Sequence, residues 1–174
     1  MSDSAAPRTG RPRTAVTVSL LLVLLTAAAL GGVLRNGFVN YDDDLYITAN
    51  PELARGLGGA GLAWAFTTTR GGNWHPLTWV SHLADVQLFG LRPAGHHAVN
   101  LALHAANVVL LFSLLRALTG ALWSSALAAA LFAVHPLHVE SVAWAAERKD
   151  VLSMLCALGA ARACVAGLRR PHRR

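Results

Sequence analysis

The pattern of apolar residues along the chain predicts a polytopic membrane protein. Apolar runs cover residues 14–34, 97–116, 118–134 and 151–168, and polar segments separate them. Each run is close to the roughly 20 residues that a helix needs to cross a hydrocarbon core about 30 Å thick. The linker between the second and third runs is very short, which indicates an antiparallel hairpin. We therefore predict an all-α membrane module over residues 14–168 with about four transmembrane helices.

The polar segment at residues 35–96 is a long first loop whose pattern predicts short helices lying along the membrane surface. Asn50-Pro51 is typical of a helix start, and residues 57–66 favour a short helix. Residues 76–89 predict an amphipathic helix. Its apolar positions are Leu77, Val80, Leu83 and Leu88, and the polar positions between them are His82, Asp85 and Gln87.

Composition and charge support this arrangement and give it a direction. The chain is 54% hydrophobic and only 14% charged, whereas about a quarter of the residues in a soluble domain are charged. Basic residues are in excess in the polar tails, residues 1–13 and 169–174, while the loops at residues 35–96 and 135–150 carry a small acidic excess. The positive-inside rule then places both termini in the cytoplasm and both loops on the extracytoplasmic face.

A cleaved signal peptide is the alternative for the first apolar run, because basic and small residues accompany it. The run is longer than the apolar part of a usual signal peptide, and further spans follow it. We therefore expect an uncleaved anchor. Membrane lipids are expected partners, and nucleic acid is not.

Three consecutive carboxylates, Asp42, Asp43 and Asp44, follow the first apolar run at the membrane surface. Like charges this close repel one another, so the cluster needs a bound cation, a network of hydrogen bonds or a reaction that uses a carboxylate. The residues themselves leave these alternatives open.

The second apolar run carries four polar residues at helical spacing: His97, Asn100, His104 and Asn107. Intervals of three, four and three residues place all four on one stripe of a helix. Such a stripe would be costly facing lipid, so we expect it to face other helices or a wet cavity. Hydrogen bonding between helices is favoured for Asn107, whereas His97 and Asn100 are also candidates for lining a site.

Histidines, acidic groups and basic groups converge on the same membrane face. These groups are compatible with three interpretations: a site for a lipid phosphate, a divalent-metal site, or loops that are polar only because they lie among headgroups. No spacing is a specific metal signature. A small transporter or channel subunit is a further alternative, which rests only on the polar stripe. The residues concerned are His75, His96, His97, His135, His138, Glu140, Glu147, Arg148, Lys149 and Asp150, together with the three aspartates.

Several motifs in order resemble one known family. They are Phe38-Val-Asn-Tyr-Asp-Asp43, Trp74-His-Pro-Leu-Thr78, the segment from Leu88 to His97, the segment from Leu131 to Val142, and Glu147-Arg-Lys-Asp-Val-Leu152. Over roughly residues 35–155 the chain resembles the N-terminal membrane module of bacterial tetratricopeptide-repeat proteins related to the transmembrane O-mannosyltransferases that target cadherins.

The resemblance implies a C-type glycosyltransferase fold in the bacterial inner membrane. It implies an inverting transfer of a sugar from a polyprenyl-phosphate donor to a hydroxyl acceptor, on a protein, at the extracytoplasmic face. Asp42 and Asp43 match the family's paired acidic motif, so one of them is the expected base or the group that holds the acceptor or a metal. A divalent metal is a possible cofactor, and its identity is open.

Substrate-binding residues follow from the same resemblance. His135, His138 and Glu140 match a His-Pro-x-His-x-Glu segment, and Arg148 and Asp150 match Arg-x-Asp. On physical grounds Arg148 and Lys149 are expected to contact the donor phosphate. His75 stands where related proteins carry Arg, and it can bind phosphate in this way only when protonated.

Length is the main departure from the family. Related proteins continue with further spans and a soluble repeat region, whereas this sequence stops after about four expected spans. The alternative expectation is therefore a truncated, non-catalytic membrane fragment or a scaffold subunit of such an enzyme.

Overall fold

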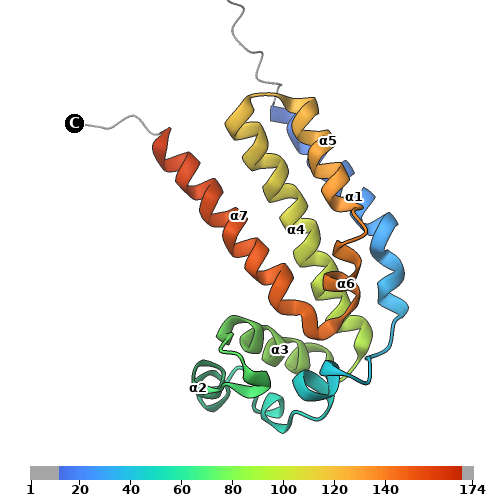
Figure 1. Ribbon diagram of the computed structural model, residues 1–174, viewed down its shortest axis with the longest axis vertical. Coiled ribbons are helices and arrows are strands. Elements are labelled where there is room, and N and C mark those ends of the chain that lie inside the picture. The colour runs from blue at the N-terminus through green and yellow to red at the C-terminus, as the bar shows by residue number, and fades with distance from the viewer. Residues whose placement is uncertain (1–11, 170–174) are drawn as a thin grey trace, which may run out of the picture.

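The computed structural model describes residues 12–169, and Figure 1 shows that this part of the chain is built from helices. No strand occurs within this range, which confirms the predicted all-α class. The tails expected at residues 1–13 and 169–174 lie almost entirely outside the described residues.

Four helices form a bundle around α4. They are α1 (Pro12–Leu30, continued by the 3-10 turn η1, Gly31–Arg35), α4 (Pro93–Thr119), α5 (Leu122–Ala133) and α7 (Arg148–Leu168). The helix α4 packs against each of the other three. The start of α1 and the end of α7 lie at the same end of the bundle (Figure 1).

Three of the four expected spans are helices long and apolar enough to cross a membrane: Arg13–Arg35, Pro93–Thr119 and Ala145–Leu168. The run predicted at residues 118–134 contains α5, which has only 12 residues. At its start, Gly120 takes a left-handed conformation that ends α4 and Ala121 is extended. At its end, Pro136 disfavours helical backbone at the residue before it, and α5 stops at Ala133.

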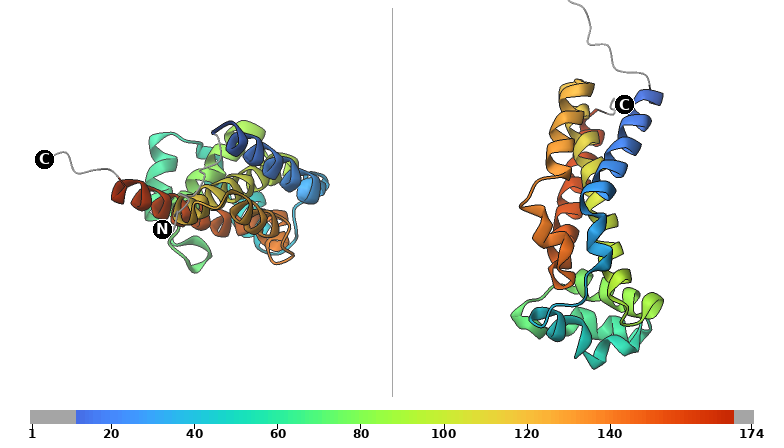
Figure 2. Two further views of the ribbon diagram at one scale, coloured as in Figure 1. Left: turned by 90° about the horizontal axis from the view of Figure 1, so that it is seen from above. Right: turned by 90° about the vertical axis from the view of Figure 1, so that its right-hand side faces the viewer.

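The loop between α1 and α4 folds into short helices gathered at one end of the bundle (Figure 2). In chain order these are the π-helical turn η2 (Asp44–Thr48), the 3-10 turn η3 (Pro51–Arg55), α2 (Gly59–Thr67), the 3-10 turn η4 (Arg70–Gly72) and α3 (Pro76–Phe89). The side chains of Tyr46, Ile47, Leu53, Trp79 and Leu83 form their core. Ala145 and Ala146, which lie just before α7, also belong to this core, so the segment leading into α7 is packed against the loop.

A second irregular stretch joins α5 to α7. It contains α6 (His138–Ala143) and the 3-10 turn η5 (Ala145–Glu147). Figure 1 shows α6 beside the lower half of α4.

The helix α3 has the predicted bounds, and the face that it turns into the protein is partly polar. Of its four predicted apolar positions only Leu83 is fully buried. Leu77 and Leu88 are 56% and 72% exposed, whereas His82 and Asp85 are buried. The reason is a buried cation: Arg148 of α7 lies against this face of α3 and pairs with Asp85. A burial rule based on apolar spacing cannot anticipate a polar face that is turned inward by an ion pair.

Candidate functional site

Arg148 is the central polar residue of the fold. It is the first residue of α7, it is fully buried, and its guanidinium makes four hydrogen bonds. It donates to Ser81 Oγ and, at 2.6 Å, to Asp85 Oδ2 on α3, and to Asn100 Oδ1 and, at 2.9 Å, the His96 carbonyl on α4. Arg148 therefore connects three helices. Its expected contact with a donor phosphate stays a prediction, and in this structure its donors are used within the protein.

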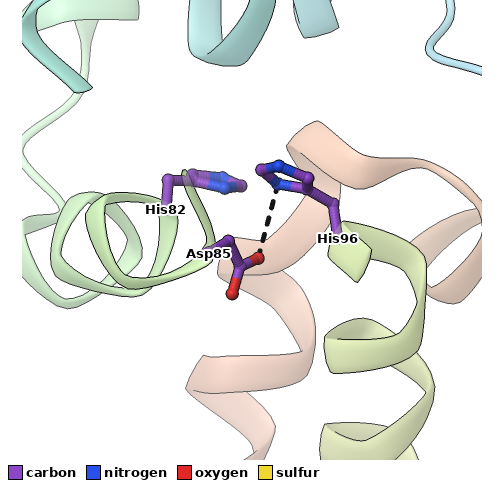
Figure 3. A group of neighbouring side chains, drawn as sticks. All are labelled: His82, Asp85 and His96. Carbon is purple, nitrogen blue, oxygen red and sulfur yellow. Dashed lines mark ion pairs between the residues drawn. The ribbon is translucent and has the colours of Figure 1, made fainter. Parts of the chain in front are cut away.

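Two imidazoles accompany this ion pair (Figure 3). His96 Nδ1 lies 3.4 Å from Asp85 Oδ2, and the His82 ring faces the His96 ring with 6.2 Å between centroids. One potential ligand atom from each of His82, Asp85 and His96 lies within 4.8 Å of the others. Burial lowers the pKa of His82 well below its ordinary value, and Arg148 adds to the effect. Burial raises the pKa of Asp85, and Arg148 opposes this.

The three consecutive carboxylates have three different environments. Asp43 is buried, and its two oxygens accept hydrogen bonds from the backbone N–H groups of Val39 and Ala146, both at 2.8 Å. Asp44 Oδ1 accepts from Thr48 Oγ1 at 2.7 Å. Asp42 is half-buried, and its carboxylate has no hydrogen-bond partner within residues 12–169. Asp42 is therefore the free carboxylate of the three, in the sense that no described residue donates a hydrogen bond to it.

A cavity of about 670 Å³ opens between the start of α3 and the first turns of α7. It brings together three of the predicted site residues, His75, Lys149 and Asp150. Its other lining residues include Trp74, Leu77, Leu152, Ser153 and Cys156, so its wall is largely apolar.

Two charged residues of opposite sign line this cavity, Lys149 and Asp150. Lys149 Nζ lies 2.6 Å from Glu147 Oε1 and 6.0 Å from the centre of the Tyr46 ring. His75 Nε2 is buried and unpaired within the described residues. Burial lowers the pKa of His75, and the charge of Lys149 lowers it further. His75 is therefore neutral at pH 7.

A smaller cavity of about 230 Å³ lies behind Asp150. It shares Asp150 and Ser153 with the larger one and is also lined by His104, Asn107 and His138. The other two residues of the predicted His-Glu segment are placed elsewhere, because His135 and Glu140 are exposed and do not line either cavity. His135 stays beside His138, with 5.9 Å between the ring centroids, but only His138 lines the cavity.

The polar stripe of α4 is buried, as the spacing predicts. His97 Nε2 lies 3.3 Å from the Gly37 carbonyl, and Asn100 donates to the Trp144 carbonyl at 2.9 Å. His104 Nε2 lies 3.3 Å from the Ala133 carbonyl, and Asn107 donates to the Val151 carbonyl at 2.9 Å. The acceptors lie in irregular backbone or at helix ends. The stripe therefore ties α4 to the loop after α1, to the end of α5 and to the start of α7 through side-chain hydrogen bonds to backbone carbonyls.

Sequence reasoning did not single out Tyr46, His82 or Asp85 as site residues, and it named His96 only among the polar groups of this membrane face. Burial raises the pKa of Tyr46, and Lys149 opposes this. The Tyr46 ring lies 5.5 Å from the ring of His75, which lines the larger cavity. The three-residue interval between His82 and Asp85 was the available signal, since it places both on one helix face.

The bundle and its cavities define a helical integral membrane protein with a polar site at one end of its spans. Comparison with known proteins adds a relationship. The chain is 34% identical over 166 residues to protein O-mannosyl-transferase Tmtc1 of Drosophila melanogaster, covering 87% of this chain and 19% of that protein. It is 34% identical over 130 residues to Tmtc2 of the same species, covering 70% of this chain and 14% of that protein. It is 32% identical over 160 residues to mouse TMTC1, covering 83% of this chain and 17% of that protein.

The chain is therefore related to the TMTC O-mannosyltransferases, which confirms that part of the resemblance read from its motifs. It spans less than a fifth of the length of these curated relatives. No protein-family model matches the chain, and no solved structure matches it.

Proposed function

We propose that this chain is the N-terminal part of an inverting C-type glycosyltransferase that moves a sugar from a polyprenyl-phosphate donor to a hydroxyl group of a protein. The relatives named above are protein O-mannosyl-transferases. The observation that carries the proposal is the cavity between α3 and α7. It is lined by a cation, Lys149, and by apolar side chains that include Leu77, Leu152 and Cys156. A lipid-linked phosphate has the same two-part chemistry.

The reaction assigns a role to the free carboxylate. Asp42 accepts the proton of the acceptor hydroxyl. At the same time the oxygen of that hydroxyl attacks the anomeric carbon from the face opposite the phosphate. The bond between that carbon and the phosphate oxygen breaks, and the lipid phosphate leaves with the electron pair. Lys149 stabilises the negative charge that develops on the leaving oxygen. Asp43 holds Asp42 in place through its bonds to Val39 and Ala146.

The proposed function also requires a defined orientation of the chain in the membrane. The loops at residues 35–96 and 135–150 face the extracytoplasmic side of a bacterial inner membrane, and both termini are cytoplasmic. Two observations support this arrangement: the basic excess of the tails, and the position of the start of α1 and the end of α7 at one end of the bundle.

Donor binding tests the proposal directly. The purified chain in lipid nanodiscs is expected to bind a fluorescent polyprenyl-phosphate mannose, and Lys149→Gln is expected to weaken binding about 10- to 100-fold. This is the loss that follows from removing one charged hydrogen bond of about 1.5–3 kcal/mol. Arg162→Gln is the matched control, because Arg162 is a cation of the same helix that does not line this cavity.

Two outcomes decide between the candidate functions. Absence of binding, or equal binding by the Lys149 variant, contradicts the proposed donor site. Binding without transfer to any hydroxyl acceptor favours the alternative, a non-catalytic membrane fragment or scaffold subunit of such an enzyme.

Protonation of His75 gives the donor site a predicted pH dependence. The pKa of His75 is lowered from 6.5, so the ring gains its proton only as the pH falls below this value. A phosphodiester stays ionised over this range, and a second cation then faces it. Donor affinity is expected to rise between pH 7.5 and 5.5 in the wild-type chain and to stay flat in His75→Gln. The same rise in both chains would assign the effect to another group.

A further inference from the structure

We propose that His82, Asp85 and His96 bind a divalent transition-metal ion, for which Zn²⁺ is the natural test ion. The three residues come from two helices, α3 and α4, and their potential ligand atoms already lie within 4.8 Å of one another. Two imidazoles and one carboxylate are ligands that Zn²⁺ and related ions accept. The site is separate from the proposed donor cavity, whose lining includes none of these residues.

The first argument is the orientation of His96. Its Nε2 lies 3.1 Å from the Gly90 carbonyl, which can only accept, so Nε2 carries the hydrogen. In the neutral ring Nδ1 is then an acceptor, yet it faces Asp85 Oδ2 at 3.4 Å. Two lone pairs that point at one another repel. A cation bound to both atoms removes this conflict, and a ring hydrogen bonded to a backbone carbonyl is the usual support for a metal-binding histidine.

The second argument is the lack of partners around His82. This side chain is fully buried, and neither ring nitrogen has a hydrogen-bond partner within the described residues. A buried polar group without a partner is costly and calls for an explanation. Figure 3 shows the His82 ring directed at His96, with Asp85 beside both. A metal ion between the two rings would satisfy one nitrogen of each.

The third argument is the support given to Asp85. Its Oδ2 already accepts a hydrogen bond from Arg148 at 2.6 Å, and Oδ1 has no partner among the hydrogen bonds of residues 12–169. Carboxylates that bind metals are commonly held by such a second hydrogen bond. Arg148 keeps Ser81, Asn100 and the His96 carbonyl as acceptors, so it remains in place while Asp85 turns one oxygen to the metal.

The net charge of the proposed metal site favours an anion as the fourth metal ligand. Arg148 already balances Asp85, so a divalent ion adds two positive charges to a buried site, and buried charge is costly. We therefore expect hydroxide or another small anion as the fourth ligand, since it lowers the net charge and completes a tetrahedral site. The bound ion would cross-link the loop helix α3 to the membrane-spanning helix α4.

Metal content provides the test. The full chain is purified in detergent, stripped with a chelator, dialysed against Zn²⁺ and analysed by elemental mass spectrometry. We expect one tightly bound Zn²⁺ per wild-type chain, and also in the control His135→Gln, whose exposed ring lies outside the site. His82→Gln and His96→Gln should lose the bound ion. Zn²⁺ should raise the melting temperature of the wild type and the control and leave both site variants unchanged.

X-ray absorption of the Zn²⁺-loaded wild type keeps the test decisive if a variant fails to fold. Two imidazole ligands and one carboxylate are expected around the ion. A wild-type chain that binds no Zn²⁺, or a bound ion without imidazole ligands, overturns the proposal. Such a result would mean that a proton or a water molecule lies between His96 and Asp85 instead. Because the proposal concerns α3 and α4, donor binding at Lys149 can succeed or fail independently of it.

Discussion

Arg148→Ala is expected to destabilise the chain by about 3–5 kcal/mol, because it leaves the buried carboxylate of Asp85 without its partner. Asn100 and the carbonyl of His96 also lose the donor that they share. Since Arg148 joins α3, α4 and α7, the whole loop end of the bundle should loosen. Unfolding by denaturant in a detergent where the wild type unfolds reversibly measures the effect.

Two further variants show whether the buried charge is the cause. Asp85→Leu combined with Arg148→Met removes both charges and should recover part of the lost stability, since apolar residues can replace a buried ion pair. Lys149→Ala is the neighbouring control. Its pair with Glu147 is partly exposed, so the expected cost is about 0–1 kcal/mol. These measurements need a chelator, so that metal bound at Asp85 does not contribute. Equal losses in the Arg148 and Lys149 variants would contradict the central role of Arg148.

We expect Asp42→Asn to reduce sugar transfer and Asp43→Asn to reduce the stability of the fold. The Asp42 variant should lose transfer by about 10²- to 10⁴-fold, which is the usual contribution of a general base, while its stability is unchanged. The Asp43 variant should lose about 1–3 kcal/mol of stability, because an amide NH₂ replaces an oxygen that accepts a backbone N–H. Transfer assays and unfolding curves on the same preparations separate the two effects.

Asp44→Asn is the internal control for this pair. Its carboxylate bonds only to Thr48 among the described residues, so both transfer and stability should stay near wild type. If Asp42→Asn retains activity and Asp43→Asn loses it without destabilisation, the roles of the two aspartates are the reverse of those proposed.

The helical fold was largely accessible from the sequence, because apolar runs and proline positions act locally. The bounds of α3 follow from Pro76 and from Gly90, which ends the helix with a positive φ. The length of α5 was not accessible, since the apolar run at residues 118–134 continues beyond both of its ends. Hydropathy measures the solvent that a residue prefers, and it does not report where the backbone stops being helical.

The candidate site was predicted in part. Spacing along one helix correctly placed the polar stripe of α4 inside the bundle. Spacing could not distinguish the environments of Asp42, Asp43 and Asp44, because one of the two partners of Asp43 is a backbone N–H more than a hundred residues away, at Ala146. The pairing of Arg148 with Asp85 is similarly remote, and it holds a carboxylate on the buried side of α3, where apolar spacing alone would not place one.

The short helix α5 has a consequence for the surrounding bilayer. Twelve residues rise about 18 Å, well below the roughly 30 Å hydrocarbon thickness. Such a hydrophobic mismatch is relieved when the adjacent leaflet thins, at a modest cost for each ångström. Headgroups beside α5 would then sink toward the turn at His135 and Pro136. A membrane thinned on this side of the bundle would bring lipid phosphates and water closer to the polar site, and the chain should partition into thin bilayers in preference to thick ones.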